Sequence, residues 1–184
     1  MSEGHENSQT EWNKKTEYYA TGSRKGPIMI WSTPYHSPHV KWRLYGHESK
    51  VTKLVWCANA SLEINPKHNQ YLASASDDKT IRIWDVELET CQHVFRQHTD
   101  EIVALEFCRN GAFLASASTD KFVYIWKVGS EKELKSADTL VHKFEAPVQL
   151  LSLNWNNGGD RISVAGNDGF LTILELAGSC SISY

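Results

Sequence analysis

The sequence lacks a long hydrophobic run, an excess of positive charge and a hydrophobic signal at its start. None of its apolar runs approaches the roughly 20 residues that cross a bilayer, so we expect no membrane partner. The formal net charge of -3 gives no basic field, so we expect no direct binding of nucleic acid. The polar first twelve residues predict a protein that is not secreted.

Cysteine is scarce, with four residues in a chain of 184. No two of them have the CxxC spacing that is typical of zinc or redox sites. Cys57 and Cys108 each follow an aromatic residue in an apolar segment, as buried thiols often do. Free thiols are typical of a reducing compartment, which predicts the nucleus or the cytoplasm.

Signs of an enzyme are missing as well. The sequence shows no clustered carboxylates, no metal-ligand spacing and no phosphate-binding loop, so we expect no catalysis and no cofactor. His36 and His39 lie three residues apart in a Pro-rich segment, but no third ligand is near them, and we expect no metal there. No stretch repeats its apolar residues every 3.6 positions. Short apolar segments alternate with turn residues instead, which predicts an all-β chain.

What the sequence does contain is a repeated strand–turn–strand unit. Residues 72–85 read LASASDDKTIRIWD, and residues 114–127 read LASASTDKFVYIWK. A weaker copy covers residues 19–31, and a degenerate one covers residues 162–175. Trp84 and Trp126 are 42 residues apart, within the roughly 40–45 residues of a four-stranded propeller blade.

These motifs resemble the WD-repeat β-propeller family, with Gly46-His47 opening a repeat that Trp84-Asp85 closes. The resemblance implies about four antiparallel four-stranded blades in a partial or open propeller, the first blade being incomplete. We expect a disordered N-terminus over residues 1–10 and a tail over residues 178–184. Between them, residues 11–177 form the blades, with boundaries at 11–45, 46–97, 98–145 and 146–177.

In this family, four side chains of a blade form one hydrogen-bonded chain. Carried over, the structural tetrads are His47, Ser74, Asp78 and Trp84 in the second blade, and His98, Ser116, Asp120 and Trp126 in the third. A Ser, a His and an Asp together suggest a catalytic triad, but the set recurs in each blade and no oxyanion hole is apparent. We therefore expect the tetrads to hold the blades together.

The outer blades depart from the tetrad pattern. Lys25 stands at the turn-Asp position of the first blade. In the fourth blade Leu174 replaces the Trp, the His position falls near Ala146, and Asp168 keeps the turn. We expect these two blades to lack the tetrad and to be less rigid.

The resemblance also places partner-binding side chains around the mouth of the propeller channel. They lie three and five residues after the His position, and just before the turn Asp. The candidates are Lys50, Thr52, Asp77, Glu101, Val103, Thr119, Gln149, Leu151 and Asn167. Asp77 and Glu101 predict a partly acidic rim that suits a basic peptide; the alternative is that each is an ordinary solvated loop residue.

A finer resemblance rests on residues 56–85, 98–126 and 155–176. These stretches are similar to the C-terminal half of the transducin-β-like corepressor proteins, which carry LisH and F-box-like segments. The resemblance implies a nuclear scaffold whose partners are corepressor and histone deacetylase subunits and histone tails. The alternative is a generic WD-repeat adaptor, such as a ubiquitin-ligase substrate receptor. Four blades are few for a propeller, so self-association is one way to complete the ring.

Overall fold

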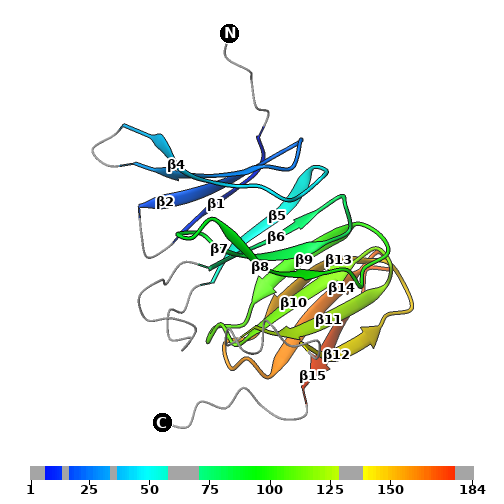
Figure 1. Cartoon of the computed structure of the whole chain (residues 1–184). Helices are drawn as coiled ribbons and strands as arrows, with labels where there is room; N and C mark the ends of the chain where they lie inside the picture. Colours follow the sequence, from blue (N-terminus) through cyan, green and yellow to red (C-terminus); the bar gives the residue numbers. More distant parts are fainter. Residues whose placement is uncertain (1–6, 14–16, 34–36, 58–70, 129–138, 177–184) are drawn as a thin grey trace.

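Each sheet of the protein is a meander of short strands joined by tight turns. A computed structural model describes residues 7–13, 17–33, 37–57, 71–128 and 139–176. All regular structure in these ranges is β-strand, and they contain no helix that could span a membrane. The strands form four antiparallel sheets, which we call sheets A to D in chain order (Figure 1).

Three of the sheets have four strands, and the fourth has three in the part of the chain that is described. Sheet A contains β1 (Asn7–Trp12), β2 (Tyr18–Ser23), β3 (Ile28–Ser32) and β4 (His39–Leu44). Sheet B contains β5 (Val51–Trp56), β6 (Tyr71–Ser76), β7 (Ile81–Asp85) and β8 (Thr90–Phe95). Sheet C contains β9 (Ile102–Phe107), β10 (Phe113–Ser118), β11 (Phe122–Lys127) and β12 (Leu140–Glu145). Sheet D contains β13 (Leu150–Trp155), β14 (Arg161–Gly166) and β15 (Leu171–Glu175).

The sheets stack in chain order with their first strands side by side. Contacts run from β1 to β5, from β5 to β9 and from β9 to β13, so these inner strands form one row (Figure 1). An apolar core lies between each neighbouring pair of sheets: A with B, B with C, and C with D. The all-β, blade-like fold is the predicted one.

The prediction that the first blade is the incomplete one is wrong. β1 begins at Asn7, so sheet A has four strands and starts before the predicted boundary at residue 11. Residues 7–10 therefore do not belong to a disordered N-terminus, whereas residues 1–6 lie outside the described ranges. A polar segment forms a strand here because it pairs with β2 at the inner edge of the sheet, where it needs no apolar side chains.

The turn between the second and third strands is the same in every sheet. Its last residue has a positive φ: Gly26 in sheet A, Lys79 in B, Lys121 in C and Gly169 in D. In sheets B, C and D an Asp directly before this residue accepts the backbone N–H two positions further on, at 2.9, 2.9 and 3.1 Å. The acidic residue of the repeat is therefore a turn cap, which explains why it survives in sheet D without the rest of the tetrad.

Candidate functional site

The predicted tetrad of sheet B forms one continuous hydrogen-bonded chain. Trp84 Nε1–H donates to Ser74 Oγ over 2.7 Å, and His47 Nε2 lies 2.7 Å from the same hydroxyl. His47 Nδ1 lies 2.8 Å from Asp78 Oδ2. A carboxylate can only accept, so the Nδ1–H donates to Asp78 and Nε2 accepts the Ser74 hydroxyl. Every donor in the chain therefore has an acceptor.

Sheet C repeats this chain almost atom for atom. Trp126 Nε1–H donates to Ser116 Oγ over 3.1 Å, His98 Nε2 lies 2.8 Å from that hydroxyl, and His98 Nδ1 lies 2.8 Å from Asp120 Oδ2. The backbone N–H of Thr99 also donates to the Asp120 carboxylate, over 2.9 Å. Two sheets with the same geometry indicate a structural unit of the fold.

The titration of these groups follows from their burial. Burial lowers the pKa of His47 and of His98, although the hydrogen bond to the neighbouring Asp opposes that shift. Burial would raise the pKa of Asp78, but the hydrogen bonds from His47 and Thr80 outweigh it and hold the pKa well below its usual range. The paired imidazoles are therefore neutral at pH 7 and the carboxylates are charged.

Burial also decides what the tetrads can do chemically. Ser74 and Ser116 have no exposed surface, and their hydroxyls are already occupied by an indole and an imidazole. A nucleophile must reach its substrate, and these two side chains cannot without opening the sheet interface. The arrangement is suited to cohesion, because a fully satisfied buried network favours a single packing.

Sheet A keeps half of the network. Trp31 Nε1–H donates to Thr21 Oγ1 over 2.9 Å, as the third-strand Trp does to Ser in sheets B and C. Lys25 precedes the positive-φ Gly26 in the turn, so no turn carboxylate stands at that position.

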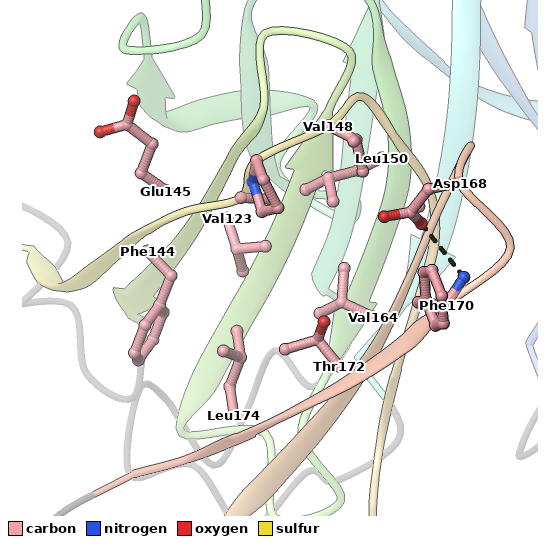
Figure 2. A pocket seen from close by; sticks show the side chains of 13 residues that line it. Val123, Phe144, Glu145, Val148, Leu150, Val164, Asp168, Phe170, Thr172 and Leu174 are labelled. Atoms are coloured by element: carbon pink, nitrogen blue, oxygen red, sulfur yellow. Dashed lines mark hydrogen bonds between the residues drawn. The ribbon is translucent and has the colours of Figure 1, made fainter.

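Sheet D has a cavity where sheets B and C have the tetrad. A space of about 80 Å³ between sheets C and D is lined by Ala146, Val164, Asp168 and Leu174, the residues at the His, Ser, Asp and Trp positions (Figure 2). Ala146 and Leu174 are smaller than the imidazole and the indole that they replace, and the apolar Val164 stands in place of the hydroxyl, so part of the volume stays unfilled. We call this space the C–D cavity.

A second hollow lies over the row of inner strands. This open cleft of about 280 Å³ is lined by side chains from all four sheets: Gln9, Lys50, Thr52, Lys53, Glu101, Val103 and Leu151. Five of the nine predicted partner-binding residues are among them, namely Lys50, Thr52, Glu101, Val103 and Leu151. We call it the inner-strand cleft.

The four remaining candidates do not line the cleft but lie beside it. Each turn residue donates its backbone N–H to the start of the inner strand: Asp77 to Lys50 over 2.9 Å, Thr119 to Glu101 over 3.0 Å, and Asn167 to Gln149 over 3.0 Å. These equivalent bonds bring the turn candidates to the same end of sheets B, C and D as the inner-strand candidates.

Two residues of the cleft, Gln9 and Lys53, were not predicted from the sequence, and neither was the unpaired hydroxyl of Thr52. Gln9 was overlooked because residues 1–10 were expected to be disordered, and Lys53 because β5 carries a bulge between Val51 and Lys53. The hydroxyl of Thr52, a residue that is only 6% exposed, has no hydrogen-bond partner among the described residues. An unpaired buried hydroxyl of this kind is commonly satisfied by an ordered water.

The cleft differs in charge from the predicted acidic rim. Lys50 and Lys53 line it together with Glu101, and Asp77 stands outside the lining. The lining is thus of mixed charge, and Asp77 lies next to Lys50, to whose carbonyl its backbone N–H donates. His39 is exposed in β4, His36 lies outside the described residues, and no cluster of three potential metal ligands occurs in the described ranges.

Comparison with known families agrees with this architecture. The family model "WD domain, G-beta repeat" matches residues 39–85 and 89–127. Each match begins near the outer strand of one sheet, β4 or β8, and ends with the third strand of the next sheet, β7 or β11. The sequence repeat is therefore offset from the structural sheet by one strand, which links neighbouring sheets covalently within each repeat.

The chain is similar in sequence to several known proteins. The chain is 38% identical over 112 residues to the F-box-like/WD repeat-containing proteins TBL1Y of Homo sapiens and TBL1X of Mus musculus, covering 61% of this chain and 20% of each relative. It is 30% identical over 133 residues to the anaphase-promoting complex subunit cdc20 of Dictyostelium discoideum, covering 53% of this chain and 26% of that one. The chain thus spans about a fifth to a quarter of the length of these relatives. The antiparallel sheets and the paired tetrads agree with the match, and residues 39–85 and 89–127 of the chain are two WD repeats.

Proposed function

We propose that this protein is a non-catalytic interaction scaffold that binds a peptide segment of a partner in the inner-strand cleft. The observation that carries the proposal is the cleft itself, which four sheets line with charged, polar and apolar side chains. Lys50, Lys53 and Glu101 offer charged groups, and the exposed Leu151 and half-buried Val103 offer apolar contact. Such mixed surfaces are typical of protein interfaces.

The charges of the cleft indicate which peptides it would favour. A basic tail, such as a histone tail, would be attracted by Asp77 and Glu101 and repelled by Lys50 and Lys53. Opposite charges across an interface affect association rate and specificity more than affinity. The two lysines therefore oppose a basic peptide, and removing them should favour its binding.

The finer proposal is that the chain serves in a nuclear corepressor complex with histone deacetylase subunits. Its support is the resemblance to transducin-β-like corepressor proteins and the 38% identity to TBL1Y and TBL1X. The second candidate is a generic WD-repeat adaptor of another assembly, such as a ubiquitin-ligase substrate receptor. Its support is the similarity to a subunit of the anaphase-promoting complex.

Peptide binding is tested by fluorescence polarisation with a labelled peptide of the histone H3 N-terminal tail. We expect the double variant Asp77→Lys, Glu101→Lys to bind roughly fivefold to tenfold more weakly, because it loses two exposed charge pairs. Lys50→Glu with Lys53→Glu should bind more tightly. The matched control, Glu145→Lys with Glu175→Lys, makes the same charge change on the outer strand of sheet C and the third strand of sheet D. Equal affinities for all four proteins would contradict the proposed cleft.

Affinity purification followed by mass spectrometry decides between the two candidate assemblies. Recovery of deacetylase and corepressor subunits supports the first, and recovery of ubiquitin-ligase subunits supports the second. The Asp77→Lys, Glu101→Lys variant should lose those partners that bind the cleft. If neither set is recovered, both assignments are wrong, whatever the peptide assay shows.

A further inference from the structure

The two faces of each sheet have different residues and different neighbours. One face carries the third-strand Trp position, which is Trp31 in sheet A, Trp84 in B, Trp126 in C and Leu174 in D; we call it the indole face. The opposite face carries a pair of aliphatic residues from the same strand, which are Ile28 and Ile30 in A, Ile81 and Ile83 in B, Val123 and Ile125 in C, and Leu171 and Ile173 in D; we call it the aliphatic face. Alternation along the strand separates the two sets.

Every interface within the chain pairs an aliphatic face with the indole face of the next sheet. Ile28 and Ile30 share a core with Trp84, and Ile81 and Ile83 share a core with Trp126. Val123 and Ile125 pack in the same way against sheet D. The chain builds this interface three times. Among the described residues, no further sheet lies on the indole face of sheet A or on the aliphatic face of sheet D.

The aliphatic face of sheet D is exposed at the positions that the other sheets bury. Leu171 is 65% exposed and Ile173 is 60% exposed, whereas Ile81, Ile83, Val123 and Ile125 are at most 2% exposed. Leu171 pairs with Ala165 across the sheet, and Ile173 pairs with Ser163. In sheet B the equivalent Ile81 and Ile83 also pair with small residues, Ala75 and Ala73. This face therefore has the composition of a buried interface, but none of the residues that the structure describes covers it.

The indole face of sheet A is a row of three aromatic rings. Trp12, Tyr19 and Trp31 are paired across β1, β2 and β3. The Trp12 and Tyr19 rings lie 4.8 Å apart, and the Tyr19 and Trp31 rings lie 6.0 Å apart. Trp12 is 55% exposed. An exposed aromatic row on a sheet face is typical of an interaction surface.

A Trp at the end of the inner strand forms a hydrogen bond to the preceding sheet in sheets B and D, and sheet A has a Trp at the same position. Trp56 ends β5, and its indole N–H donates to the carbonyl of Glu11 in the preceding sheet over 3.1 Å. Trp155 ends β13, and its indole N–H donates to the carbonyl of Glu106 over 3.1 Å. Trp12 ends β1 at the same position. By this equivalence, the acceptor for Trp12 is the carbonyl of Asn154, the residue before Trp155 in sheet D.

We propose that two copies of the chain associate head to tail, with the indole face of sheet A in each copy covering the aliphatic face of sheet D in the other. A second copy is the occupant because the chain itself carries both halves of the interface it builds three times. The two contacts are equivalent by a twofold axis and close a ring of eight sheets, a size known for propellers. In the ring, Trp12 of each copy donates to Asn154 of the other.

Sedimentation equilibrium of the 184-residue chain at micromolar concentration tests the proposal. We expect twice the mass of the single chain, and about thirtyfold weaker association for Trp12→Lys and for Leu171→Lys with Ile173→Lys, the loss typical of an interface hot spot. Both changes fall on side chains that are exposed in the single chain, so its fold should survive, which circular dichroism checks. Leu88→Lys, an equally exposed apolar residue in the turn before β8, is the matched control and should leave the dimer intact.

Mixing the two variants tests the head-to-tail arrangement. The Trp12→Lys copy retains an unchanged sheet D, and the Leu171→Lys, Ile173→Lys copy retains an unchanged sheet A, so the mixture should associate more strongly than either variant alone. A symmetric contact between identical faces would not be restored by mixing. A chain that stays monomeric, or a dimer that neither variant weakens, would overturn the proposal without bearing on peptide binding in the inner-strand cleft.

Discussion

Sheets B and D show what one hydrogen-bonded chain contributes to a blade. Both have the same turn, with an Asp before a positive-φ residue and the same backbone bond from the turn to the inner strand. Sheet B fills the space behind the turn with His47, Ser74 and Trp84, which are at most 5% exposed. Sheet D has the C–D cavity at that place. The turn alone therefore does not specify the packing of the blade.

This difference between sheets B and D shows that the geometry of the turn and the packing between sheets depend on different residues. Trp84 lies in the core between sheets A and B, so the tetrad orients the side chain that joins two blades. Leu174 contacts the core between sheets C and D only from its edge and remains partly exposed. We infer that the interface between sheets C and D is weaker than the two interfaces that precede it.

Removing the indoles of sheets B and C is the test of this comparison with the largest expected effect on stability. We expect Trp84→Ala or Trp126→Ala to lower the free energy of unfolding by about 3–5 kcal/mol, because each leaves a cavity and removes the indole donor from the buried Ser hydroxyl. Leu174→Ala should cost clearly less, about 1–2 kcal/mol, since the site is already hollow and partly exposed. Urea denaturation followed by circular dichroism measures both. Equal losses in sheets B and D would remove the distinction between them.

A smaller change isolates the hydrogen bonds from the packing. Ser116→Ala removes the hydroxyl that links Trp126 to His98, and we expect a loss of about 1–3 kcal/mol from the two buried groups left unpaired. Ser163→Ala in sheet D is the control. Made in the Trp12→Lys background, which weakens the proposed association between copies, it should change stability by less than about 0.5 kcal/mol, as is usual for a surface site. If Ser116→Ala is neutral in urea denaturation, the tetrad does not stabilise the sheet.

The comparison can also be reversed by building a tetrad into sheet D. The triple variant Ala146→His, Val164→Ser, Leu174→Trp fills the C–D cavity and supplies Asp168 with an imidazole partner. We expect a gain of about 0.5–2 kcal/mol, in the range of other cavity-filling changes. Differential scanning calorimetry gives the melting temperature. The control is Leu88→Trp, at an exposed residue in the turn before β8 that lies outside the proposed dimer interface. A triple variant that melts no higher than Leu88→Trp would show that the four positions are not equivalent.

The smallest expected effect is a pH dependence. The pKa values of His47 and His98 are lowered in the folded state, so between those values and about 6.5 the unfolded chain binds more protons. Stability is therefore complete above pH 6.5 and falls as the pH drops through this window, and the lowered pKa values of Asp78 and Asp120 extend the loss below pH 4. Urea midpoints from pH 8 to pH 5 measure the slope. His47→Asn with His98→Asn should flatten it near pH 6; an unchanged slope would assign the dependence to other groups.

Much of this arrangement could be predicted from sequence, for a physical reason. Residues 72–85 and 114–127 repeat the same polar residues at the same spacing, and a period-2 strand fixes which of them share a face. The cleft could be predicted only in part, because five of the nine candidates line it while a bulge in β5 brings Lys53 in as well. β1 escaped prediction because its residues 7–10 are polar, at an inner edge that needs no apolar side chain. The C–D cavity was not predicted, because an unfilled volume between two sheets has no sequence motif of its own.

Hydrogen exchange of the Trp12→Lys variant tests the central claim most directly, since that change holds the chain as a single copy and leaves sheets B, C and D untouched. The account predicts that amides of β6 and β10, beside the tetrads, exchange only when the whole chain unfolds. Amides of β14, beside the C–D cavity, should exchange faster through local opening. Equal protection of β6, β10 and β14 would contradict the claim that the tetrads lock sheets B and C and that sheet D is the weak end.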